Sequence, residues 1–135
     1  MDLYRNDYVA LELEEARGLV RFTRLEKKLK GTEELDPAFA PLEKVIQSVD
    51  RSRYVLLVDL RRGPLRNDPE FEQAMERYRV GLSTGFRRVA VLVRSAVGEL
   101  QVQRQARQNG GSAKIFHDEA EALTFLGAAQ VARAG

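Results

Sequence analysis

Apolar residues occur along the chain in short runs of two kinds, with the two-residue period of strands or the longer period of helices. The segment from Tyr8 to Leu13 alternates in part, which is the pattern of a half-buried strand. Residues 15–18 predict a turn, and the run from Leu19 to Thr23 predicts a second strand, so we expect a hairpin. Residues 24–34 are highly charged and indicate a loop or a ragged helix.

Two Asp-Pro pairs predict helix starts. In Asp36-Pro37 and in Asp68-Pro69, the aspartate suits the N-cap and the proline suits the first helical position. An apolar stripe follows each pair at helical spacing. The stripes consist of Phe39, Leu42, Val45, Ile46 and Val49 in the first helix, and of Phe71, Met75, Tyr78 and Leu82 in the second, up to about Gly85.

Two nearly continuous apolar runs, residues 54–60 and 89–93, are typical of strands covered on both faces in a parallel sheet. Ser95 predicts the cap of a third helix that runs to Asn109-Gly110-Gly111 and is largely in solvent. Residues 113–116 indicate a short strand. Asp118 and Glu121 resemble a capping box that opens a last helix, with an inward face of Ala122, Phe125, Leu126 and Ala129.

The predicted order is therefore β-β-α-β-α-β-α-β-α. Strands that alternate with helices imply parallel strands joined by crossovers, with an antiparallel hairpin added. The expected fold class is α/β, with a mixed, mostly parallel sheet of about five strands and about four helices. We expect one domain over residues 1–135, with a frayed tail at 128–135.

Composition narrows the function classes only a little. Lys and Arg number 22 and Asp and Glu 20, a net charge of +2, which is too mild a balance to indicate nucleic-acid binding. The absence of cysteine excludes disulfides and thiolate metal sites. We see no signal peptide and no apolar run near the ~18 residues that span a bilayer, so we expect a cytoplasmic protein without a membrane span, metal or cofactor.

Three segments, taken with the predicted element order, match a known family: Val55-Leu56-Leu57-Val58-Asp59-Leu60, Arg66-Asn67-Asp68-Pro69-Glu70-Phe71 and Arg88-Val89-Ala90-Val91-Leu92-Val93. On these segments the chain resembles, from about Tyr8 to Leu126, the SpoIIAA-like branch of the STAS superfamily, the fold of anti-sigma-factor antagonists. The resemblance implies a regulatory domain that binds partners. In true antagonists a serine or threonine at the start of the helix after the central strand is phosphorylated. Residues 59–77 here contain no Ser, Thr or Tyr, so that switch does not carry over.

The segments that follow the central strands are the predicted binding surface. Ligands of open α/β sheets favour the crevice beyond the carboxyl ends of the strands, and a helix N-terminus there favours an anion. The candidate binding residues are Arg61, Arg62, Arg66, Asn67, Asp68, Arg94 and Ser95. The competing interpretation is that the arginines are solvated and that Asp68 already occupies the anion position.

Three other patterns favour structural roles. Asp59 occupies a place like that of the phosphoaccepting aspartate of receiver domains. Receivers, however, have a helix between their first two strands, where this chain has a tight turn. We therefore interpret Asp59 as a buried aspartate bonded to backbone N–H groups. His117 is the only histidine, and no nucleophile elbow accompanies it. The Gln- and Arg-rich segment 101–107 lacks aromatic residues for base stacking, so we interpret it as a solvated helix face.

The function that we predict is a non-enzymatic regulatory or partner-binding domain that works at this rim, with an unidentified protein as its partner. The alternative is a domain that binds a small anionic or acyl metabolite at the same rim. The sequence leaves a homodimer open.

Overall fold

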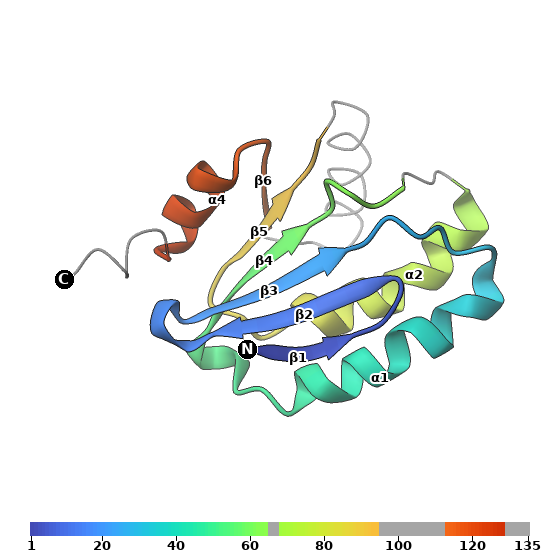
Figure 1. The fold of residues 1–135 in the computed structure, drawn as a ribbon, viewed down its shortest axis with the longest axis horizontal. Helices are drawn as coiled ribbons and strands as arrows, with labels where there is room; N and C mark the ends of the chain where they lie inside the picture. The colour runs from blue at the N-terminus through green and yellow to red at the C-terminus, as the bar shows by residue number, and fades with distance from the viewer. Residues whose placement is uncertain (65–67, 95–112, 129–135) are drawn as a thin grey trace.

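In the part of the chain that the structure describes, six strands form one mixed sheet, in the order in which they occur along the sequence (Figure 1). In the computed structural model, residues 1–64, 68–94 and 113–128 are described. The strands are β1 (Asp2–Arg5), β2 (Val9–Glu14), β3 (Leu19–Arg24), β4 (Val55–Asp59), β5 (Val89–Leu92) and β6 (Lys114–Phe116). Strands β1, β2 and β3 pair antiparallel, and β3 to β6 pair parallel.

The predicted hairpin is confirmed as β2 and β3. A 3-10 turn, Glu15–Arg17, joins the two strands, and Gly18 follows it with φ of 60°, a conformation that glycine adopts without steric cost. Strand β1 was not predicted, so the expected count of about five strands is one too low. Four residues are too few to show a period, and the register of β1 shifts between Asp2 and Tyr4.

The two central apolar runs lie side by side and point in the same direction. Leu56 is the register partner of Val89, and Asp59 is the partner of Leu92. The prediction of adjacent parallel strands is therefore confirmed. Because parallel strands end at the same edge, the segments that follow β3, β4, β5 and β6 all emerge at one rim of the sheet.

Three α-helices lie in the described residues: α1 (Leu35–Gln47), α2 (Pro69–Ser83) and α4 (Glu119–Leu126). The caps predicted for α2 and α4 are confirmed. The Asp68 carboxylate accepts from the N–H groups of Glu70 and Phe71, and the Asp118 carboxylate accepts from that of Glu121. The predicted cap of α1 is wrong: the helix already begins at Leu35, and no side chain caps it. Asp36 instead accepts a hydrogen bond from the hydroxyl of Tyr78 on α2.

Residues 24–34 form a loop with one short 3-10 helix, Thr32–Glu34. A second one, Arg51–Arg53, precedes β4. The helix predicted from Ser95 to Gly111 lies outside the described residues, as does the predicted inward position of Ala129. Ala128 is buried, and its carbonyl accepts from Arg17. None of the described helices is long and apolar enough to cross a membrane.

Apolar side chains on the two faces of the sheet form two core layers. Helices α1 and α2 cover one face, where Leu11, Phe22 and Leu56 pack with Phe39, Leu42 and Tyr78. Helix α4 covers the other face, where Leu57 and Leu92 pack with Leu126 (Figure 1). The apolar residues of β4 point alternately to the two layers, which explains why the sequence of this strand is apolar throughout.

Candidate functional site

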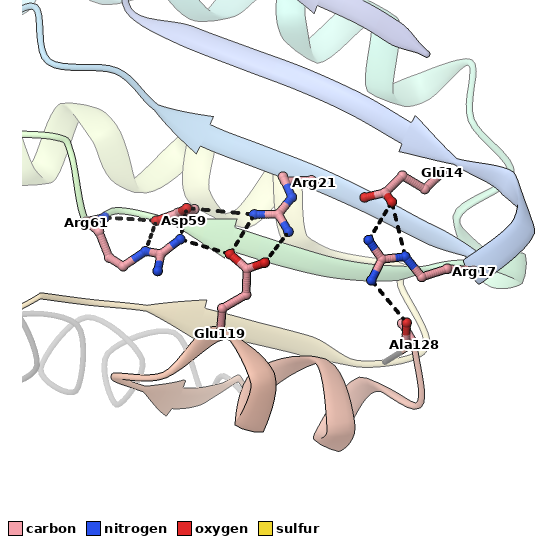
Figure 2. Close-up of polar contacts among 7 residues, drawn as sticks. All are labelled: Glu14, Arg17, Arg21, Asp59, Arg61, Glu119 and Ala128. Carbon is pink, nitrogen blue, oxygen red and sulfur yellow. Dashed lines mark hydrogen bonds and ion pairs between the residues drawn. The ribbon is translucent and has the colours of Figure 1, made fainter. Parts of the chain in front are cut away.

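Four charged side chains form a closed cluster at the rim, between the sheet and the start of α4 (Figure 2). This ion-pair cluster consists of Arg21, Asp59, Arg61 and Glu119. Arg61 donates from Nε and Nη2 to the Asp59 carboxylate at 3.0 and 2.8 Å, and Nη2 also donates to Glu119 at 2.9 Å. Arg21 donates to both oxygens of Glu119 at 3.3 and 3.1 Å and lies 3.8 Å from Asp59. The two positive charges therefore balance the two negative ones.

Strand register and one local turn bring these side chains together. Thr23 is the register partner of Asp59, so Arg21, two residues earlier on β3, lies on the same face as Asp59. Arg61 lies two residues beyond Asp59, and its backbone N–H also donates to the Asp59 carboxylate at 3.1 Å, as in an Asx turn. Glu119 is the first residue of α4, so the cluster fastens that helix to β3 and β4.

Electrostatics holds both carboxylates in the charged form. The Asp59 side chain is 7% exposed; burial opposes its ionisation, yet the hydrogen bonds and charge of Arg61 outweigh burial and lower its pKa. Hydrogen bonds from Arg21 are the main cause of the lowered pKa of Glu119. The Asp59 hydrogen bonds raise the pKa of Arg61. The expectation that Asp59 is buried and bonded to a backbone N–H is confirmed, and two guanidinium groups join that contact.

Arg62 and Asp68 also have partners inside the chain. Nε of Arg62 donates to Glu26 at 2.7 Å, and both side chains are more than half exposed. Asp68 caps α2, so its carboxylate occupies the place where an anion would meet the free N–H groups of that helix. Part of the competing interpretation is thereby confirmed, because Asp68 caps its own helix. The arginines Arg61 and Arg62, however, are paired with carboxylates.

The remaining candidates differ in what the structure shows. Arg94 follows β5 at the same rim, is exposed, and has no carboxylate partner among residues 1–64, 68–94 and 113–128. Arg66, Asn67 and Ser95 lie outside the described residues. His117 follows β6 and is exposed.

Arg24, at the end of β3, is a rim residue that sequence reasoning missed. It is the register partner of Val9, whose side chain belongs to the core layer under α1 and α2. Arg24 therefore lies on the sheet face opposite the ion-pair cluster. Its Nη1 donates to the carbonyls of Tyr8 and Leu25 at 2.9 and 2.8 Å, and its guanidinium carbon lies 5.8 Å from the Tyr8 ring centroid.

Burial of the Arg24 side chain lowers its pKa, and no carboxylate in the described residues forms an ion pair with it. Its stem packs on the loop after β4, since a Cβ added to Gly63 would lie 2.4 Å from Arg24 Cγ. In a sequence, a charged residue at the end of a strand gives little indication of a functional role. Only the fold reveals that this guanidinium is half-buried and has no counter-ion among the residues that the structure describes.

The sequence also did not identify Arg21 and Glu119 as rim residues. Arg21 is the polar position between apolar neighbours in β3, and Glu119 follows a helix cap; both patterns are usual for solvent-facing residues. As for metals, the described ranges contain no group of three or more His, Asp or Glu side chains arranged to hold one. The described part of the rim therefore contains an ion-pair cluster whose charges cancel, and two arginines, Arg24 and Arg94, that have no carboxylate partner there.

Comparison with known proteins confirms the fold. No family model matches the chain. No curated protein matches it either. Among solved structures, the chain is similar to an uncharacterized protein of the DUF3478 family with a SpoIIAA-like fold from Shewanella loihica PV-4. The two are 19% identical, the match covers 91% of this chain and 97% of that one, and the TM-score is 0.58. The predicted SpoIIAA-like fold is thus confirmed, and a likeness at this identity supports the fold alone.

Proposed function

We propose that this chain is a non-enzymatic partner-binding domain whose working surface is the rim at the carboxyl ends of β3, β4 and β5. The observation that carries the proposal is the unequal use of the rim arginines. Arg61 and Arg62 are paired with carboxylates, whereas Arg24 and Arg94 have no carboxylate partner within residues 1–64, 68–94 and 113–128. The described rim therefore has uncompensated positive charge on a rigid base, which favours an acidic partner surface.

The ion-pair cluster supports this proposal by making the rim stiff. Each arginine of the cluster contacts both carboxylates, so moving one side chain disturbs all four. Residues ordered before binding lose little entropy when a partner docks, which favours affinity. The regulatory role that the SpoIIAA-like resemblance implies is part of the same proposal, with the serine switch omitted because residues 59–77 lack a phosphorylatable side chain.

A charge reversal at the exposed rim tests the proposal. Purified wild type, Arg94→Glu and Arg53→Glu serve as baits in a quantitative pull-down, and each candidate partner is then purified and titrated by calorimetry. Arg53 is the matched control because it is exposed and precedes β4, at the opposite end of the sheet. We expect a partner that binds wild type and Arg53→Glu but binds Arg94→Glu at least about tenfold more weakly. Equal binding by the two variants would refute the rim as the working surface.

The alternative, a small anionic or acyl metabolite at the same rim, has less support in the described residues. The N-terminus of α2 is already capped by Asp68, and Arg61 and Arg62 are already paired. A metabolite that binds only the folded state raises the melting temperature by mass action. A melting screen with organic anions therefore separates the two functions: a saturable rise that Arg94→Glu removes would favour the metabolite.

A further inference from the structure

Three arginines of the described residues pair with carboxylates through the same edge of the guanidinium, whereas Arg21 meets Glu119 with Nη1 and Nη2. Arg17, Arg61 and Arg62 each direct Nε and Nη2, the two nitrogens on the same side of the guanidinium, toward a carboxylate (Figure 2 shows the first two). In the Arg61–Asp59 pair the two nitrogens donate to two different oxygens, which is the favoured fork geometry. In the Arg17 and Arg62 pairs both nitrogens donate to one carboxylate oxygen.

Arg24 is held through Nη1, the nitrogen that lies outside this edge. Its Nη1 is used twice, for the carbonyls of Tyr8 and Leu25, while Nε and Nη2 have no hydrogen-bond partner in the described part of the chain. Of the fully buried side-chain nitrogens and oxygens in that part, only Arg79 Nε lacks a partner. Solvent therefore reaches the Nε/Nη2 edge of Arg24. The rest of the side chain is buried enough to lower the pKa of the guanidinium.

Neighbouring groups hold this edge in place and keep its charge uncompensated. The Tyr8 ring lies beneath the Arg24 guanidinium, and Lys27 adds a second cation 5.2 Å from the same ring centroid. The nearby acids have other partners: Glu26 pairs with Arg62, Asp7 with Lys27, and Glu34 accepts from the Tyr8 hydroxyl. Arg24 is thus a half-buried cation in a fixed orientation, and its Nε and Nη2 donors can bind a planar anion.

We propose that the Nε/Nη2 edge of Arg24 is a binding site for a carboxylate, supplied by an acidic side chain of the protein partner. The inference rests on the proposed partner-binding function and names the chemistry that the partner brings to the rim. A carboxylate there forms two parallel N–H···O bonds with Nε and Nη2 and supplies a counter-ion that the described residues do not provide. The face is distinct from that of the ion-pair cluster, because Arg24 lies on the α1/α2 side of the sheet.

The Nε–Hε signal of Arg24 in proton–nitrogen NMR spectra reports on this edge directly. Its assignment follows from the peak that Arg24→Lys removes. We titrate wild type with sodium acetate, with the peptide acetyl-Glu-Gly-Glu amide and with its Gln counterpart, using sodium chloride at matched ionic strength as the blank. Acetate and the Glu peptide are expected to shift the Arg24 signal saturably, while the Gln peptide and chloride leave it in place.

Variants test whether the fork itself is responsible. Arg24→Lys keeps a positive charge but offers no side-on pair of donors, so we expect the Glu peptide to bind about tenfold more weakly, measured by backbone amide shifts of residues 24–27. The control Arg53→Lys, at the opposite end of the sheet, should bind the peptide as wild type does. No saturable shift with acetate or with the Glu peptide would overturn the site. Tighter binding of acetate than of the peptide would overturn the assignment to a protein side chain.

The titration is independent of the pull-down. If the Arg24 signal does not respond but Arg94→Glu loses a partner, the rim function stands and the carboxylate site fails. If the signal responds but Arg94→Glu and Arg53→Glu bind alike, the carboxylate site stands and the proposed working surface fails.

Discussion

Replacement of Asp59 by asparagine tests how much the ion-pair cluster contributes to stability. The amide has the size of the carboxylate but carries no charge and has one acceptor oxygen in place of two. It can still accept from the Arg61 backbone N–H, which lies 3.1 Å from Oδ1. Its NH2 group, however, then faces Nη2 of Arg61, which donates to Oδ2 at 2.8 Å in the native cluster. One charge-assisted hydrogen bond is lost, and two donors oppose each other.

The expected cost follows from the environment of each partner. A hydrogen bond to a charged group contributes about 1.5–3 kcal/mol, and breaking a fully buried pair costs about 3–5 kcal/mol. Asp59 is nearly enclosed, but the Arg61 side chain is 36% exposed and keeps Glu119 as a partner. Arg61 is therefore not left buried and unpaired in the variant. We expect a loss of about 2 kcal/mol in the free energy of unfolding, or roughly 8 °C in melting temperature.

Urea unfolding at pH 7, followed by circular dichroism, measures this loss. Glu26→Gln is a matched control, because its pair with Arg62 uses the same guanidinium edge but is exposed on both sides, and we expect less than about 0.5 kcal/mol. A double-mutant cycle with Arg61→Gln should give a coupling of at least about 1 kcal/mol. A cost for Asp59→Asn no larger than that of the control would refute the claim that burial strengthens the cluster.

Three other predictions concern acid, backbone packing and capping. The carboxylates of Asp59 and Glu119 have lowered pKa values in the folded state, so their contribution to stability is fully present above about pH 5 and is lost as pH falls through the lower folded values. Urea titrations from pH 2 to 7 should show a steeper acid loss for wild type than for Asp59→Asn, and parallel curves would contradict this. Gly63→Ala places a methyl group 2.4 Å from Arg24 Cγ. We expect thermal unfolding to show a loss of about 1–3 kcal/mol in the free energy of unfolding, and the NMR signal of Arg24 Nε–Hε to move. An unchanged signal would show that the loop moves and Arg24 does not. Asp68→Ala removes the α2 cap and should cost about 1 kcal/mol in urea unfolding, whereas Asp68→Asn, which keeps an acceptor, should cost less; equal losses would speak against the cap.

Much of the fold was predictable because its signals are local. The apolar runs of β4 and β5 indicated strands covered on both faces, and the caps at Asp68 and Asp118 marked where helices begin. Where local signals were ambiguous, the prediction failed. Asp36-Pro37 resembles a helix start, but α1 begins at Leu35, because proline is also tolerated in the first turn. Strand β1 was missed because it is short and irregular.

The candidate site was predictable only as a location. The carboxyl ends of parallel strands meet at one edge, so the sequence placed Arg61, Arg62 and Arg94 at a common rim. It did not reveal which charges are neutralised. Arg61 pairs with Glu119, which is 58 residues away in the chain, and no local pattern encodes that contact.

The sequence by itself determined the α/β class, the direction of the central strands and the rim where the arginines gather, because periodicity, capping and chain connectivity act between near neighbours. Only the tertiary structure decided which arginines of the described residues pair with carboxylates and which do not. That outcome depends on strand register and on contacts between distant segments, which place Arg21 and Arg61 against carboxylates and Arg24 against backbone carbonyls. Arginines that look alike in the sequence thereby have different roles in the folded protein.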